Sequence, residues 1–341
     1  MVLIFGLKPQ KGDVVCGDFN LYQRADGSFE KFPVVLVSGM HDGPVVSISA
    51  NLHGDEYTGT LSIHELIQDK HFRDNLRGTI IFLPTLNPIG AIRKRRFYSF
   101  SNEDPNRNFP DEKSISLESK NFTRFCMKKL FLELKNYTSF HIDLHCSKLI
   151  SNPFCYLRRD LLNGEVDKLV YQKSSLAVNH FGIPVVYNGS SNFDKIKNTF
   201  IGSLVYLAKI PGFTVELGSK KYVQSEHILT GVNGIKRTLK YLGVYFGDVN
   251  DSTLREDLFS GKKRVCMHPR LFQSGVIKFL VKPGDDIKSG DRVATINDLY
   301  GEKISDGFVY SKYDAHVLCQ IEGAFFSKND SILKLAIDDN I

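Results

Sequence analysis

An imidazole and a carboxylate stand three residues apart in the segment 51–57, directly after an apolar run that is typical of a buried strand. They belong to His53 and Glu56. A catalytic zinc ion takes three protein ligands of nitrogen or oxygen type and leaves one position open, and two His with one Glu is a known ligand set. The missing ligand is then expected to be a second His at the end of another strand. His145 fits, because it closes the alternating run 140–145.

Four further polar residues suit the binding and hydrolysis of a substrate that carries a carboxylate. Asn106 and Arg107 place an amide beside a guanidinium in a polar loop, and such a fork of donors can hold a carboxylate bidentately. Arg96 closes a basic cluster that begins at Arg93, most of which is expected to be solvated surface. Glu216 ends an apolar strand and precedes a Leu-Gly pair, where a carboxylate is either a strand-end cap or a general base.

Taken in order, these motifs resemble the zinc carboxypeptidase superfamily, and most closely its succinylglutamate desuccinylase and aspartoacylase branch. They are His-Gly-Asp-Glu at 53–56, an Arg eleven residues before the Arg of Asp-Pro-Asn-Arg-Asn-Phe-Pro at 104–110, Asp-Leu-His at 143–145, and Glu-Leu-Gly at 216–218. Two positions depart from the family pattern: Pro105 replaces a Leu, and Asp111 replaces a Gly. Both change the expected loop shape, and neither removes a group that does chemistry.

The resemblance implies a zinc-dependent hydrolase that cleaves an amide bond next to a carboxylate, with one Zn²⁺ per chain. The implied activity is that of an N-acyl amino acid deacylase. The alternatives are a metallocarboxypeptidase that removes a C-terminal residue from a small peptide and a catalytically inactive ligand-binding protein. The implied metal ligands are His53, Glu56 and His145. Glu216 is the implied general base, and Arg96 the implied partner of the oxyanion. Asn106 and Arg107 are the implied pair that binds the substrate carboxylate.

Two residues beside the expected His145 ligand need separate treatment. Cys146 adjoins it on an alternating strand and therefore points the other way, so it is not expected to be a nucleophile or a fourth ligand. Zinc hydrolases of this type also keep the fourth position for water. Asp143 shares the strand face of His145, where it either supports the site or has a purely structural role.

Apolar periodicity indicates which elements must position these residues. Strands are expected at 34–37, 45–49, 79–83 and 140–144, and helices at 57–68, 116–134, 166–179 and 225–242. This alternation predicts an α/β fold with a mixed, largely parallel sheet flanked by helices, of the zinc carboxypeptidase type. Ligands collect at the carboxyl ends of strands in such sheets. The sequence therefore predicts that His53, His145 and Glu216 converge there.

A change in amino-acid composition along the chain predicts two domains. Residues 1–246 are expected to form the catalytic domain, N-terminal segment included, and the polar stretch 247–261 a linker. Residues 262–341 contain short β-rich runs broken by Gly and Asp, and resemble the biotinyl/lipoyl-like barrel that ends many members of the same branch. No carrier lysine is expected, because the corresponding hairpin at 297–302 has no Lys. The barrel is expected to act as a structural lid or an oligomer contact.

Composition narrows the expected partners. The net charge of +6 over 341 residues is mild and dispersed, which argues against nucleic-acid binding. No apolar run approaches the roughly 18 residues of a membrane span, and the N-terminus lacks the features of a signal peptide. Six cysteines without a Cys-x-x-Cys pair favour reduced thiols in a cytoplasmic protein. The expected partner is a small carboxylate-bearing N-acyl amino acid or short peptide, and homo-oligomer formation is left open.

Overall fold

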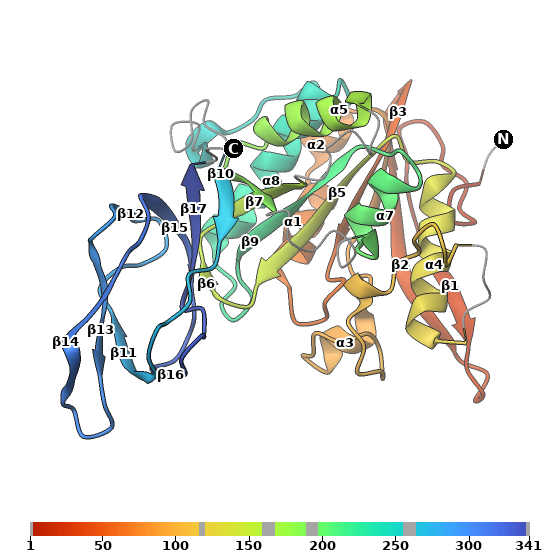
Figure 1. Ribbon diagram of the computed structural model, residues 1–341. Helices are drawn as coiled ribbons and strands as arrows, with labels where there is room; N and C mark the ends of the chain where they lie inside the picture. The colour runs from red at the N-terminus through yellow and green to blue at the C-terminus, as the bar shows by residue number, and fades with distance from the viewer. Residues whose placement is uncertain (1–2, 116–119, 159–167, 189–196, 255–263, 339–341) are drawn as a thin grey trace.

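The structure is a computed structural model that describes residues 3–115, 120–158, 168–188, 197–254 and 264–338 (Figure 1). Within these residues a thirteen-stranded sheet dominates the molecule. Its strands lie in the order β1 (Val14–Gln23), β2 (Phe29–Ser38), β4 (Arg77–Leu83), β3 (His41–Ala50), β5 (Phe140–Ser147), β9 (Gly212–Ser219), β7 (Phe154–Arg158), β8 (Val185–Asn188), β10 (Arg264–Met267), β17 (Leu333–Asp338), β15 (Ala315–Gln320) and β12 (Asp286–Ile287), with β6 (Ile150–Ser151) beside β15.

The sheet contains two parallel groups of strands, joined by the antiparallel pair β9 and β7, and its flanks are antiparallel. Strands β4, β3, β5 and β9 run parallel to one another, as do β7, β8 and β10. Strands β1 and β2 close one flank in antiparallel pairing, and β17, β15 and β12 close the other. The predicted mixed α/β sheet is therefore confirmed, and its parallel part is where carboxyl ends of neighbouring strands meet at one edge.

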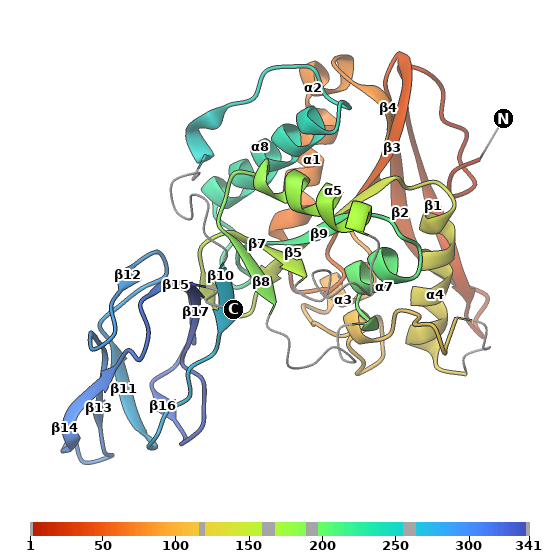
Figure 2. The same cartoon turned by 45° about the horizontal axis from the view of Figure 1, so that its top comes forward.

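Helices cover both faces of the sheet (Figure 2). One face packs against α1 (Thr58–Gln68), α2 (Lys70–Asp74), α5 (Lys168–Asn179) and α8 (Ser225–Tyr241) through one buried apolar cluster. The other face packs against α4 (Phe122–Lys135) and α7 (Phe200–Tyr206) through a second cluster. Two short elements, α3 (Pro88–Ile92) and the 3-10 turn η1 (Pro105–Arg107), lie beyond the strand ends.

The predicted elements agree with these bounds, with one clear difference. Each of the four predicted strands lies inside an observed one, in β2, β3, β4 and β5. The helix expected from 116 begins at Phe122, because the side chain of Asn121 accepts a hydrogen bond from the backbone N–H of Arg124 and caps the helix there. Residues 116–119 and 166–167 of the two predicted helices lie outside the described residues.

The C-terminal part of the chain joins the large sheet and also forms a second one. Strand β10 pairs with β8, and β17 pairs with β10, so the sheet continues without a break from the N-terminal part of the chain into the last segment. A separate antiparallel sheet has the order β14 (Lys303–Tyr310), β13 (Arg292–Asn297), β11 (Gly275–Phe279) and β16 (Phe325–Phe326), with its own apolar core. The predicted linker holds the 3-10 turn η4 (Asp251–Thr253), and its residues 255–261 lie outside the described residues.

Two global expectations can be compared with the structure. All six cysteines are free thiols. No helix among the described residues combines the length and apolar character needed to cross a membrane.

Candidate metal centre and substrate pocket

Three strands deliver the predicted site residues to the carboxyl edge of the parallel sheet. β3 ends at Ala50, and the loop before α1 carries His53 and Glu56. Asn51 shapes this loop: it adopts a left-handed φ of 53°, and its side-chain amide donates to the backbone carbonyls of His53 and Glu56 at 3.2 and 3.0 Å. His145 on β5 stands opposite Glu216 on β9 in the strand register. The structure therefore brings His53, Glu56, His145 and Glu216 to one cavity.

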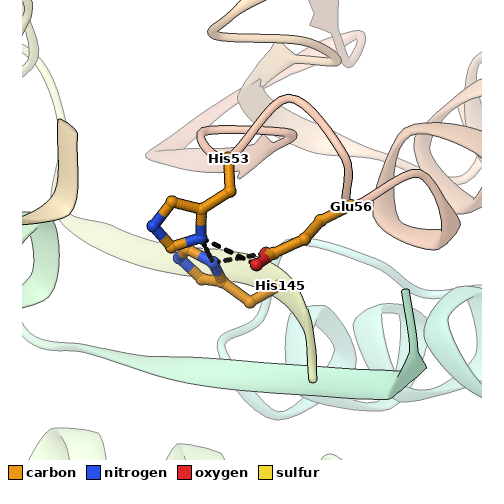
Figure 3. Close-up of side chains that lie close together, drawn as sticks. All are labelled: His53, Glu56 and His145. Carbon is orange, nitrogen blue, oxygen red and sulfur yellow. Dashed lines mark hydrogen bonds and ion pairs between the residues drawn. The ribbon is translucent and has the colours of Figure 1, made fainter. Parts of the chain in front are cut away.

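Figure 3 shows two imidazoles and one carboxylate facing a common point. His53 Nδ1 lies 2.8 Å from Glu56 Oε1, His145 Nδ1 lies 2.8 Å from Glu56 Oε2, and the two Nδ1 atoms lie 3.1 Å apart. Each residue is buried, with 3% of its surface exposed. Within the described part of the chain, this is the one group of at least three His, Cys, Asp or Glu side chains that could hold a metal ion.

The second nitrogen of each imidazole faces a carboxylate. His145 Nε2 lies 2.9 Å from Asp143 Oδ2, and His53 Nε2 lies 3.1 Å from Asp104 Oδ1. A neutral imidazole carries one N–H, and a carboxylate can only accept, so a neutral ring that donates from Nε2 to its outer carboxylate keeps a lone pair on Nδ1 for a metal ion. In that state two Nδ1 lone pairs lie 3.1 Å apart beside the Glu56 carboxylate, and a proton or a metal ion is needed to relieve their repulsion. The donor set and its outer carboxylates match those of a metal centre.

The electrostatics of the buried group also favour a positive charge. Burial opposes the charging of His145, yet the carboxylates of Asp143 and Glu56 raise its pKa well above the usual value. For Glu56, burial again opposes the charge, but His53 and His145 hold the pKa of the carboxyl well below its usual range. The pocket therefore stabilises a cation next to an ionised Glu56, and a divalent metal ion fits these residues.

Cys146 contributes its backbone rather than its thiol. Its N–H donates to Glu56 Oε2 at 3.0 Å and so fixes the carboxylate. Burial and the charge of Glu56 raise the pKa of the Cys146 thiol to about 12, which keeps it protonated at neutral pH. This agrees with the expectation that Cys146 is neither a nucleophile nor a fourth ligand.

Glu216 lines the same cavity as a partly buried carboxylate. Its Oε2 atom is buried and has no hydrogen-bond partner among the described residues. Burial raises the pKa of Glu216, the nearby Glu56 raises it further, and Lys334 opposes both. A carboxylate with a raised pKa and a buried oxygen that can still accept a hydrogen bond from water or substrate has the properties of a general base.

Asp104, the first residue of the motif at 104–110, anchors Arg96 beside the ligands, although no role is predicted for it from the sequence. The Nε and Nη2 atoms of Arg96 donate to Asp104 Oδ2 at 3.2 and 2.9 Å, while Arg96 Nη1 lies 3.4 Å from Glu56 Oε1. Asp104 thus contacts both Arg96 and His53. Burial opposes its ionisation, but the bond from His53 and the charge of Arg96 hold the pKa of Asp104 well below its usual value. The guanidinium is positioned next to the point where the three ligand atoms meet.

Asn106 and Arg107 lie in η1 at the wall of the cavity. Asn106 Oδ1 accepts the backbone N–H of Phe200 at 2.8 Å, which leaves its NH₂ group as the donor for a ligand. Arg107 is exposed, and its Nη1 donates to the backbone carbonyl of Asn106 at 2.6 Å. Pro105 lies at the first position of this turn, where its fixed φ suits a helical start.

All seven predicted residues line one cavity of about 880 Å³, together with residues that sequence reasoning missed. Part of its wall comes from the C-terminal segment: Cys266, His268, Ile321, Ser331 and Lys334. Lys334 on β17 donates from Nζ to the hydroxyl of Tyr156 on β7 at 2.8 Å. It adds a cation to a pocket that already holds Arg96 and Arg107. The cavity therefore offers one carboxylate base and several positive groups to an anionic ligand.

A mixed α/β sheet that gathers two His and one Glu beyond its parallel strands defines the class: a zinc carboxypeptidase-like fold. Residues 42–242 match the family model described as succinylglutamate desuccinylase/aspartoacylase catalytic domain. The chain belongs to this family.

Solved structures of this family share the fold over nearly the whole chain. A succinylglutamate desuccinylase/aspartoacylase from Rhodobacter sphaeroides is 20% identical, with a TM-score of 0.76 and 96% of each chain covered. The ectoine utilization protein EutE (DoeB) from Ruegeria pomeroyi, solved with product bound, is 18% identical, with a TM-score of 0.74 and 95% of each chain covered. An aspartoacylase family protein from Mesorhizobium loti is 16% identical, with a TM-score of 0.76 and 96% of each chain covered. No curated protein matches the sequence.

Proposed function

We propose that the protein is a zinc-dependent N-acyl amino acid deacylase that hydrolyses an amide bond next to a carboxylate. The observation that carries the proposal is the meeting of three buried ligand atoms, from His53, Glu56 and His145, beside a carboxylate with a free buried oxygen. Family membership supports it, because the family takes its name from two deacylases. One zinc ion per chain is proposed, as two His and one Glu are a known set for catalytic zinc.

The chain's own residues divide the work of hydrolysis. When bound, the zinc ion lowers the pKa of a water toward about 7 and polarises the scissile carbonyl. Glu216 takes a proton from the attacking water and passes it to the departing amine. The atom that accepts the proton is Oε2 of Glu216, which has no hydrogen-bond partner among the described residues. Arg96 Nη1 faces the developing oxyanion, and Asp104 holds the guanidinium in place for it. The Arg96 guanidinium is anchored before substrate arrives, so it requires little reorganisation.

Binding selectivity is assigned to the positive wall of the cavity. The NH₂ of Asn106 and the guanidinium of Arg107 hold a substrate carboxylate, and the adjacent bond is then presented to the metal. Among the solved relatives, one is named for ectoine utilization and another as an aspartoacylase family protein. Those names concern those proteins, and the acyl group taken by this chain is left to assay.

The alternative is a metallocarboxypeptidase that acts on a small peptide with the same ligands. The C-terminal segment favours the deacylase, because it walls the cavity with residues such as Ser331 and Lys334 and so limits the length of the substrate. The division into a catalytic domain (1–246), a linker (247–261) and a barrel-like domain (262–341) without carrier lysine belongs to the same proposal. So does a cytoplasmic location, whereas the oligomeric state is left open.

The test combines metal content with amine release from a panel of N-acyl amino acids and short peptides. About one zinc per chain with turnover of N-acyl amino acids is expected, whereas turnover of peptides alone would favour the carboxypeptidase. His53→Ala should lose zinc. Glu216→Gln should keep zinc and lose about 100-fold or more in kcat, the contribution of a general base. A fully active Glu216→Gln enzyme, or a wild-type protein that takes up no zinc on reconstitution, would overturn the proposal.

A further inference from the structure

A row of buried polar side chains leads away from the metal ligands across the middle of the large sheet. Ser47 and Ser49 lie on β3, opposite His141 and Asp143 on β5, and His145 follows on the same face. Each has at most 3% of its surface exposed. The adjoining positions on the same face of β2 and β4 are apolar: Val34, Leu36, Ile81 and Leu83. The polar row thus borders an apolar surface on its β4 side, while on its other side β9 places Thr214 and Glu216 beside Asp143 and His145.

Hydrogen bonds connect the row from one end to the other in a single direction. The carboxylate of Asp143 can only accept, so the Ser49 hydroxyl donates to Oδ1 at 2.8 Å. Ser49 has then spent its hydrogen, and its oxygen accepts from His141 Nε2 at 3.0 Å. A neutral His141 keeps a lone pair on Nδ1, which accepts from the Ser47 hydroxyl at 2.6 Å. Burial lowers the pKa of His141 to about 4, in agreement with a neutral ring.

The other oxygen of Asp143 completes the connection to the metal site. Oδ2 accepts from His145 Nε2 at 2.9 Å, which leaves His145 Nδ1 as the ligand atom. Because Ser49 occupies Oδ1, the carboxylate is held at both oxygens and cannot turn away from His145. Every hydrogen in the row is used once, and no second arrangement of a neutral His141 satisfies the Ser49 hydroxyl and Asp143 together.

We propose that His141 is a positioning residue for the metal centre. It orients the hydroxyl of Ser49, and through Ser49 and Asp143 it holds the ring of His145 in the tautomer that binds metal. The inference rests on the proposed function, since it concerns the metal centre assigned there. Apolar side chains at 47 and 141 would fit the surrounding core and avoid the cost of burying polar groups. The polar row is therefore explained by what it does for the ligand at its end.

The test measures zinc affinity by chelator competition on the apo form of the full chain, so it does not depend on a substrate. Ser49→Ala and His141→Phe should each raise the Kd for zinc about tenfold, the lower end of the effect of losing a partner behind a metal ligand. Ser49→Thr keeps a hydroxyl and should restore affinity to within about threefold of wild type. Ser47→Ala is the matched control: it is the same change on the same strand and face, but at the far end of the row.

The outcomes separate positioning from simple packing. Positioning is supported if Kd rises for Ser49→Ala, recovers for Ser49→Thr and stays within about threefold for Ser47→Ala, whatever the melting temperatures of the apo proteins. It is overturned if Ser49→Ala, or a folded His141→Phe, binds zinc like wild type while Asp143→Ala does not. If His141→Phe does not fold, the Ser49 pair decides the matter. A wild-type chain that binds no zinc overturns the proposed function itself, and this inference with it.

A direct spectroscopic readout is available as well. Nitrogen-15 NMR of the zinc-loaded protein labelled at His should show His141 as the Nε2–H tautomer, with Nδ1 unprotonated. A Nδ1–H tautomer, or a charged ring at neutral pH, contradicts the hydrogen-bond direction and overturns the inference.

Discussion

Replacement of Asp104 by asparagine tests how the proposed metal centre and the proposed oxyanion partner, Arg96, are held together. Asp104→Asn keeps the size of the side chain and removes its charge. The carboxylate now accepts from His53 Nε2 with one oxygen and from Arg96 Nε and Nη2 with the other. An amide can preserve the first contact through its oxygen, but it turns its NH₂ toward the guanidinium, where donor meets donor.

The magnitude follows from these contacts. A hydrogen bond to a charged group contributes about 1.5–3 kcal/mol, against about 0.5–1.5 kcal/mol between neutral groups. The weaker contact to His53 therefore costs about 1 kcal/mol, which lowers zinc affinity about fivefold. Arg96 loses both bonds to Asp104, and because the pair is partly exposed we take about 1.4 kcal/mol for this loss, a tenfold fall in kcat at saturating zinc.

The assay measures the Kd for zinc on apo protein, then kcat and KM at saturating zinc. Asp111→Asn is the control, because it makes the same change in the same loop at a carboxylate that accepts from Ser114 and Asn198 instead of from site residues. The control should match wild type in all three quantities. The reasoning is refuted if Asp104→Asn binds zinc within twofold of wild type and keeps its kcat.

Three further predictions concern metal removal, the pocket wall and thiol reactivity. A metal ion at 100 times its Kd stabilises the folded state by about 2.7 kcal/mol. Because the entropy of unfolding is about 2.1 cal/mol/K per residue, removal of the metal by a chelator should lower Tm by about 4 °C, as measured by calorimetry. Lys334→Met should raise KM for anionic substrates about tenfold in steady-state kinetics, as expected for loss of one charged contact; an unchanged KM would exclude Lys334 from substrate binding. The pKa of Cys126 is raised to about 12, chiefly by burial. Ellman's reagent at pH 8 should therefore modify the exposed Cys16 in the native protein and Cys126 only after unfolding.

Residues next to strand ends were predictable from the sequence, because their position follows from local periodicity. His145 and Glu216 close apolar alternating runs, and parallel pairing then brings them to one edge of the sheet. The fold could be predicted for the same reason. For Asp143 the sequence leaves two roles open, support of the site and a purely structural one. The spacing places Asp143 on the strand face of His145, but it cannot show that its Oδ1 atom accepts a hydrogen bond from Ser49.

The residues that the sequence did not reveal depend on contacts between distant or irregular segments. Asp104 precedes a turn, and its bonds to His53 and Arg96 depend on how that turn folds back over the β3 loop. Asn51 takes a left-handed backbone that no periodicity indicates. Lys334 reaches the cavity because β17 pairs with β10 and β10 with β8, a pairing order that the alternation of strands and helices does not determine.

The unbroken sheet that links β8, β10 and β17 has a consequence for biosynthesis. Domains are made and folded from the N-terminus onward. The metal ligands lie on or beside β3 and β5, but the wall that includes Lys334 forms only after β17 has left the ribosome and paired with β10. The edge of β8 is open until β10 pairs with it, and the edge of β10 is then open until β17 is made. An open strand edge is a template for pairing with another chain. A nascent chain thus acquires the proposed metal ligands before the C-terminal wall of the cavity, and C-terminal truncation is expected to expose an unpaired strand edge that promotes aggregation.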